Sequence, residues 1–328
     1  MLLWLLLLGG FVLLVVGGEL LVRGAVDVAS RLGVSPLVIG LTLVGLGTSA
    51  PELVTSVQAG LSGSPGIAYG NIVGSNIANI LLILGVSALL SPMLVDSRAL
   101  RRDGVFMVFV VTVFALLAAL LDFGRLLGAA FVATLAGYIL IALRQERQAE
   151  AADHGAAFDK GEAAQGADPG LRSKPSSTRT LALPLLISLA GLGIVVLGGN
   201  LLVTGAVGLA REWDISESII GLTIVALGTS LPELVTSVIA ALRKQADVAF
   251  GNIVGSSIYN VLGIGGVTAL IAPGPVPADI SSFDMPVMVG AAAIALVLAY
   301  TGRRFSRLEG ALLLACYAGY IWWLWVHH

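Results

Sequence analysis

Two acidic residues stand in the middle of otherwise apolar stretches of this 328-residue chain, inside nearly the same short motif. Glu52 lies in GTSAPEL and Glu233 in GTSLPEL. A carboxylate among apolar side chains is costly unless it is paired or solvated. Oxygen ligands with no His or Cys nearby favour hard cations such as Na⁺ and Ca²⁺ over transition metals. The two motifs therefore predict a cation site that carries two negative charges.

A second polar motif follows each acidic one. In GNIVGSNIAN the polar residues recur at i, i+4 and i+8, which places them on one face of a helix. We expect ion contact for Ser75, Asn79, Ser256 and Asn260. The first residues of the two stripes, Asn71 and Asn252, fit either ion contact or hydrogen bonding between helices.

The proline in each acidic motif predicts a break in the helix. Pro51 and Pro232 lack a backbone N–H, and their rings clash with the preceding turn. Each motif also fits a capping box, S-x-x-E, in which the glutamate only caps the half-helix that follows. Capping and ion binding are compatible, and the carbonyl oxygens that a broken helix exposes suit a cation.

The chain is an internal duplication. Glu233 follows Glu52 by 181 positions, and the same offset aligns residues 17–85 with residues 198–266 without insertion or deletion. Self-similarity of this kind identifies two copies of one structural unit.

Composition places both copies in a lipid bilayer. Hydrophobic residues make up 57% of the chain and charged residues 12%, about half the share in soluble domains. The 41 glycines fit close helix packing in lipid. The net charge of −2 gives no sign of a nucleic-acid partner, and a single cysteine, Cys316, excludes an internal disulfide framework and a multi-cysteine metal site.

Apolar segments predict ten membrane spans in two sets of five. The first repeat, residues 1–144 with its core at 36–91, contains spans at about 2–29, 36–61, 67–91, 104–122 and 125–144. Residues 145–180 are polar and predict a disordered cytoplasmic linker. The second repeat, residues 181–328 with its core at 217–271, contains spans at about 182–210, 217–242, 248–271, 283–301 and 308–326.

Loop charges predict the orientation. With the N-terminus outside, the inner loops collect nearly all Arg and Lys residues, and the outer loops hold only Arg125 and Arg211. Five spans per copy is an odd number, so the second copy must be inverted and the C-terminus must also lie outside. The predicted fold is an all-α integral membrane protein with ten transmembrane helices in two inverted five-helix repeats and broken helices at the ion site. Such architecture is typical of transporters.

Three further acids need separate explanations. Glu19 has Arg23 one helical turn away, which predicts a local ion pair. Asp103 and Asp122 fall at span ends, where their carboxylates can reach water.

At its two motif pairs the sequence resembles the cation/calcium exchanger superfamily, specifically the prokaryotic sodium/calcium exchanger branch. The motifs are GTSAPE with GNIVGSN, and their repeats from Gly228 and Gly251. The resemblance covers nearly the whole chain and implies that Glu52 and Glu233 bind both Ca²⁺ and Na⁺. It also implies further ligands: backbone carbonyls of Gly45, Thr48, Ala226 and Thr229, and side chains of Ser49, Ser75, Ser230, Ser256, Asn79 and Asn260.

The sequence departs from some relatives at one site position. Potassium-dependent members have Asp where this chain has Asn260, so a titratable group is missing here. Proton/calcium exchangers of the superfamily have an acidic residue where this chain has Gly-Ser in its second motif.

The predicted function is secondary active exchange of Ca²⁺ for Na⁺ by alternating access, in a prokaryotic inner membrane. No resident cofactor, nucleic acid or obligate protein partner is expected. A proton-driven cation antiporter on the same scaffold is the alternative, and a cation channel is a weaker one. An intramembrane hydrolase is disfavoured, because no His or Cys lies near the motif serines to activate them.

Overall fold

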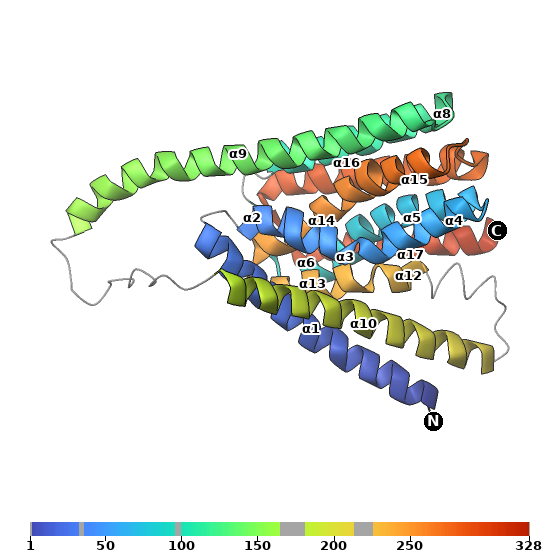
Figure 1. The fold of residues 1–328 in the computed structure, drawn as a ribbon, viewed down its shortest axis with the longest axis horizontal. Coiled ribbons are helices and arrows are strands. Elements are labelled where there is room, and N and C mark those ends of the chain that lie inside the picture. Colours follow the sequence, from blue (N-terminus) through green and yellow to red (C-terminus); the bar gives the residue numbers. More distant parts are fainter. Residues whose placement is uncertain (1, 33–35, 96–99, 165–180, 213–225, 328) are drawn as a thin grey trace.

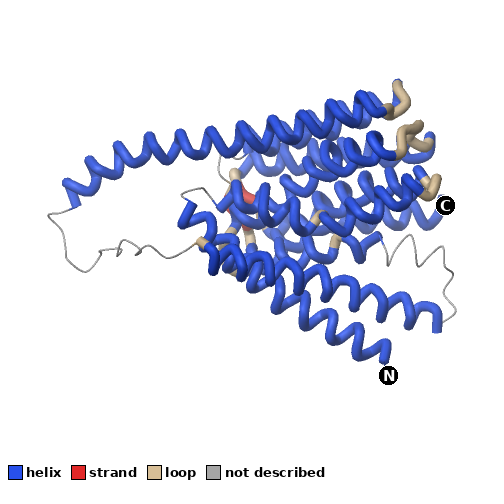
Figure 2. The backbone as a smooth tube through the Cα atoms, viewed as in Figure 1, coloured by secondary structure: helices blue, strands red, loops and turns tan. Residues whose placement is uncertain are grey.

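The computed structural model describes residues 2–32, 36–95, 100–164, 181–212 and 226–327. Within these ranges the chain is a bundle of long, roughly aligned helices, with strands confined to two short segments (Figures 1 and 2). Among the described residues, eight helices are long and apolar enough to cross a membrane. The structure is therefore that of an all-helical membrane protein, as the sequence predicts.

The elements of the first half, with their bounds, are as follows. They are α1 (Leu2–Leu32), α2 (Pro36–Ile39), the π-helical η1 (Gly40–Val44), α3 (Gly45–Thr48), α4 (Ala50–Leu61), α5 (Pro65–Ile77), the π-helical η2 (Ala78–Ile83), α6 (Leu84–Leu90), β1 (Met93–Leu94), the π-helical η3 (Leu100–Gly104), α8 (Val105–Leu120) and α9 (Arg125–Ala164).

The second half repeats this order where it is described. Its elements are α10 (Ala182–Glu212), α12 (Ala226–Thr229), α13 (Leu231–Leu242), α14 (Ala246–Ile258), the π-helical η6 (Tyr259–Gly265), α15 (Gly266–Ile271), the π-helical η7 (Ile280–Asp284), α16 (Met285–Gly302), β2 (Arg304–Phe305) and α17 (Arg307–His327).

Helix α9 differs from the expected linker. It continues as a helix to Ala164, well past the predicted span end at residue 144 and beyond the bundle (Figure 1). Ala, Glu, Gln, Lys and Arg dominate this stretch, and all are good helix formers even without an apolar face. The rest of the expected linker, residues 165–180, and the start of the predicted 217–242 span lie outside the described residues.

Helices α1 and α10 are antiparallel and touch backbone to backbone. A Cβ added to Gly17 would lie 2.7 Å from the backbone nitrogen of Val195, and one added to Gly198 would lie 2.8 Å from that of Leu14. Gly17 and Gly198 are equivalent in the duplication. Only glycine permits so close an approach, as expected for helices packing in lipid.

Short strand contacts repeat across the duplication. Met93 and Leu94 of β1 pair with Phe305 and Arg304 of β2, and Phe123 bridges Gly274 through two 3.0 Å hydrogen bonds. Adding 181 to residues 93–94 gives residues 274–275, and subtracting 181 from residues 304–305 gives residues 123–124, so the two contacts join equivalent segments. The two halves therefore make equivalent contacts with each other in both directions.

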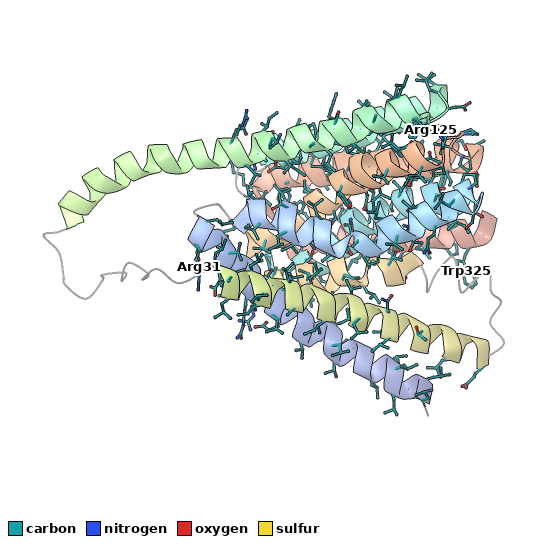
Figure 3. All side chains as sticks on the ribbon, viewed as in Figure 1. Arg31, Arg125 and Trp325 are labelled. Atoms are coloured by element: carbon teal, nitrogen blue, oxygen red, sulfur yellow. The ribbon has the colours of Figure 1, made fainter. Side chains whose placement is uncertain are left out.

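The two ends of the bundle carry different residues. Arg31 lies at one end, and Arg125 and Trp325 lie at the other (Figure 3). The N and C marks stand at the end shared with Arg125, whereas the continuation of α9 projects from the Arg31 end (Figure 1).

The prediction for Asp103 is wrong, and that for Asp122 is confirmed. Asp122 is exposed, but Asp103 is buried. The Asp103 carboxylate accepts hydrogen bonds from Arg102 Nε at 2.7 Å and from the Tyr138 hydroxyl at 2.8 Å. A neighbouring arginine and a tyrosine on α9 give this carboxylate the partners that water was expected to supply.

Candidate cation site

Both motif helices break at the serine before the proline. Helix α3 ends at Thr48 and α4 starts at Ala50, while α12 ends at Thr229 and α13 starts at Leu231. The intervening serines have nearly the same backbone angles: φ −82° and ψ 7° at Ser49, and φ −88° and ψ 5° at Ser230. The prolines are at the starts of α4 and α13, so the break falls where the sequence predicts it.

The capping-box interpretation of the two motifs is wrong. Neither serine caps the half-helix that follows it. Instead, Ser49 Oγ donates to Glu233 Oε1 at 2.7 Å, and Ser230 Oγ donates to Glu52 Oε1 at 3.1 Å. Each serine thus reaches across to the carboxylate of the opposite repeat, and the two contacts are related by the 181-residue offset.

The two carboxylates are buried without a counter-charge. Glu52 and Glu233 are each 1% exposed, and the second carboxylate oxygen of each, Oε2, has no hydrogen-bond partner. No Arg, Lys or His in the described ranges forms an ion pair with either. Ionised carboxylates that are buried without an ion-pair partner are costly unless a cation binds to them.

Neutral oxygens surround this pair. Ser230 Oγ lies 3.3 Å from Ser75 Oγ, and Ser256 Oγ donates to the Gly45 carbonyl at 3.2 Å. The structure therefore brings both stripe serines to the motif segments. Ser75 and Ser256 are both buried.

The last residues of the two stripes lie in π-helical segments. Asn79 is in η2 and Asn260 is in the equivalent η6, and each is 1% exposed. Both side-chain polar atoms of Asn79, and the Oδ1 oxygen of Asn260, have no hydrogen-bond partner. π-Helical segments inside α-helices are frequent at functional sites.

The motif threonines make side-chain bonds of their own. Thr48 Oγ1 lies 3.1 Å from the Val44 carbonyl of its own helix and 3.3 Å from Asn252 Oδ1, and Thr229 Oγ1 lies 3.4 Å from Asn71 Oδ1. Their backbone carbonyls, at the helix breaks, are the atoms that the resemblance implies as ligands. Ala226 is the first residue of α12, one turn before the break.

Sequence reasoning missed two serines near the site and one arginine outside it. Ser56 and Ser237 each accept a hydrogen bond from a stripe asparagine, and their spacing of four residues from each motif glutamate was the available signal. The predicted pair of Glu19 with Arg23 is confirmed, but Arg243 at the end of α13 also binds Glu19. The equivalent of Glu19 in the second repeat is Asn200, so the duplication carried no signal for this contact.

The chemistry available here is that of hard oxygen ligands. The described residues contain no group of three or more His, Cys, Asp or Glu side chains that could hold a metal. Two carboxylates with serine, asparagine and carbonyl oxygens suit an alkali or alkaline-earth ion rather than a transition metal. A buried site of this kind among membrane-spanning helices is typical of ion transporters.

The chain belongs to the sodium/calcium exchanger protein family, whose profile matches residues 2–144 and 183–326. Members of this family are ion antiporters.

Known relatives match along nearly the full chain. CaxA of Alkalimonas amylolytica is 38% identical over 319 residues, which cover 95% of each chain. Sodium/calcium exchanger MaX1 of Methanosarcina acetivorans is 34% identical over an alignment that covers 97% of each chain. A solved structure of the sodium-calcium exchanger NCX_Mj, soaked with 10 mM Na⁺ and zero Ca²⁺, superposes with a TM-score of 0.82 at 30% identity over 98% of both chains. The resemblance found in the motifs is thereby confirmed.

Proposed function

We propose that this protein is a secondary active antiporter that exchanges Ca²⁺ for Na⁺ by alternating access at a site between Glu52 and Glu233. The observation that carries the proposal is the mirrored pair of contacts, Ser49 to Glu233 and Ser230 to Glu52. These contacts hold two buried carboxylates at the interface of the repeats and leave one oxygen of each without a partner.

The proposed ligands are the motif and stripe residues together. They are the side chains of Glu52, Glu233, Ser49, Ser230, Ser75, Ser256, Asn79 and Asn260, and the backbone carbonyls of Gly45, Thr48, Ala226 and Thr229. The Gly45 carbonyl already accepts the Ser256 hydroxyl and the Ser49 amide. The Ser256 hydroxyl would turn its hydrogen away from this carbonyl when a cation enters.

The proposed architecture is ten transmembrane helices in two inverted five-helix repeats. Residues 1–144 form the first repeat, residues 145–180 a cytoplasmic linker, and residues 181–328 the second repeat. Two observations support this arrangement: the strand contacts that recur at equivalent segments of the two halves, and the location of both termini at the Arg125 end (Figures 1 and 3). Both termini would lie outside a prokaryotic inner membrane; the relative YrbG of Escherichia coli is called an inner membrane protein.

Charge explains why exchange would be coupled. One Ca²⁺ or several Na⁺ neutralise two carboxylates, so the two cargoes compete for the same oxygens. An empty site would carry two buried, uncompensated charges through the change of access. The empty protein would therefore change access slowly, and one cargo would have to replace the other.

Ca²⁺ uptake into proteoliposomes tests the proposal. Vesicles loaded with Na⁺ and diluted into Na⁺-free buffer should take up Ca²⁺, whereas a pH gradient alone should drive none. Uptake on the pH gradient alone would instead identify the proton-driven antiporter. Ca²⁺ entry without any gradient of counter-ion, when a charge shunt is supplied, would identify a channel.

A further inference from the structure

The first asparagine of each polar stripe is not among the proposed ligands, yet its side chain makes three hydrogen bonds at the site. Asn71 is the seventh residue of α5, and Asn252 is the seventh residue of α14. Asn252 is fully buried and Asn71 is partly buried.

The amide nitrogen of each asparagine binds the half-helix that carries the glutamate of its own repeat. Asn71 Nδ2 donates to the Glu52 carbonyl at 3.2 Å and to Ser56 Oγ at 2.9 Å. In the other repeat, Asn252 Nδ2 donates to the Glu233 carbonyl at 3.3 Å and to Ser237 Oγ at 2.8 Å. Both N–H groups of each amide are thereby used.

The amide oxygen of each asparagine binds the opposite repeat. Asn71 Oδ1 accepts the Thr229 hydroxyl, and the next residue, Ser230, donates to the Glu52 carboxylate. The contacts therefore close a ring from Asn71 through Thr229 and Ser230 to Glu52 and back to Asn71. A second ring runs through Asn252, Thr48, Ser49 and Glu233.

We infer that Asn71 and Asn252 are positioning residues that couple the two halves of the cation site. Each fixes the backbone of one glutamate and the helix break that supplies the serine partner of the same glutamate. Both donors of each amide bind the half-helix of one glutamate, and the amide oxygen faces a threonine at the helix break of the opposite repeat. Loss of either amide removes the contact between the repeats at the threonine beside the serine, which loosens the carboxylate geometry that Ca²⁺ needs.

This inference rests on the proposed function, and equilibrium Ca²⁺ binding to the purified full chain tests it without requiring transport. Asn71→Leu keeps the approximate shape and removes every polar atom. We expect the Kd for Ca²⁺ to rise at least about tenfold, the effect of losing one net hydrogen bond at the site. Asn252→Leu should do the same.

Asn76 supplies the matched control. It is a buried asparagine in the same helix, and its amide donates only to the Ile72 carbonyl of its own helix at 2.8 Å. Asn76→Leu should leave the Kd within about twofold, whatever it does to thermal stability. An equal rise of Kd in Asn76→Leu and Asn71→Leu would overturn the inference, because it would show a general packing effect.

A double-mutant cycle with Thr229 isolates the contact between the repeats. Thr229→Val removes the hydroxyl but keeps the backbone carbonyl, and Thr229→Ser keeps both. Thr229→Val should weaken Ca²⁺ binding in the wild-type background. In the Asn71→Leu background the same substitution should raise the Kd by a smaller factor, because the contact is already lost. Thr229→Ser should bind Ca²⁺ as the wild type does. If Asn71→Leu does not fold, the comparison of Thr229→Val with Thr229→Ser still tests the link.

The outcomes separate the two claims. Wild-type protein that binds neither Ca²⁺ nor Na⁺ would overturn the proposed function together with this inference. Wild-type protein that binds Ca²⁺, with Asn71→Leu and Thr229→Val binding equally well, would overturn the positioning role alone.

Discussion

Replacing Glu52 by glutamine separates ion binding from helix architecture. Glutamine has nearly the same shape, and its oxygen can still accept the Ser230 hydroxyl that now binds Glu52 Oε1. The substitution removes one of the two buried charges. Glu52 is 1% exposed and has no ion-pair partner among the described residues. The substitution therefore tests charge with little change of packing.

The magnitude follows from the loss of a buried charge opposite a bound cation. A divalent ion about 3 Å from a carboxylate, at an effective dielectric constant of about 20, gains roughly 11 kcal/mol of gross Coulomb energy from it. Dehydration of the ion and repulsion between the two carboxylates offset most of that gain. Removing one partner of a buried ionic contact costs about 3–5 kcal/mol net, which is roughly two to four decades in Kd.

The same substitution should not destabilise the ion-free protein. Glu52 Oε2 has no hydrogen-bond partner, so neutralising this side chain removes an uncompensated buried charge. We expect the thermal midpoint of Glu52→Gln in chelator to equal or exceed that of the wild type. Stabilisation by added Ca²⁺ should be lost.

Glu309 provides the control, because it forms the kind of capping box that the two motifs lack. Its carboxylate accepts the Ser306 amide at 2.6 Å, and the Ser306 hydroxyl lies 3.3 Å from the Glu309 amide. Glu309→Gln should lower stability by about 1 kcal/mol or less and leave Ca²⁺ binding unchanged. Wild-type Ca²⁺ affinity in Glu52→Gln would refute the assignment of Glu52 as a ligand.

Three smaller predictions concern the scaffold. Gly17→Ala should cost about 1–3 kcal/mol of stability and depress exchange, because its new methyl group meets the backbone of α10; thermal unfolding and uptake assays check this. Tyr138→Phe should cost about 1.5–3 kcal/mol in the unfolding free energy, since it removes a hydrogen bond to the buried Asp103 carboxylate. Arg243→Gln should shift stability by less than about 1 kcal/mol, because its partner Glu19 is partly exposed and keeps Arg23; a larger loss would contradict the view of this cluster as a surface ion pair.

The fold was largely predictable because the signals are local and duplicated. Apolar segment lengths gave helix positions, and the proline after each motif serine gave the breaks. The partners of the motif serines were not predictable in the same way. Ser49 fits a local cap by spacing, but its hydroxyl binds Glu233, a residue 184 positions away. The Ser49 hydroxyl donates to a buried carboxylate instead of accepting a local backbone N–H, and sequence spacing carries no sign of this choice.

The remaining differences also come from contacts distant in sequence. Asp103 was expected to reach water, but Tyr138 on α9 meets it inside the bundle. Asn79 was expected on a regular helix face, and it lies instead in a π-helical segment, which its sequence does not distinguish from an α-helix. The duplication identified Asn79 and Asn260 as an equivalent pair without showing what either contacts.

Anomalous diffraction from crystals soaked in Sr²⁺, a heavier analogue of Ca²⁺, is the most direct test of the paired-glutamate site. The account predicts one strong peak per chain within about 2.3–2.7 Å of oxygens from both Glu52 and Glu233, and its loss when Na⁺ replaces Sr²⁺. A peak bound by only one of these carboxylates, a peak elsewhere, or Sr²⁺ that remains in place in saturating Na⁺ would contradict it.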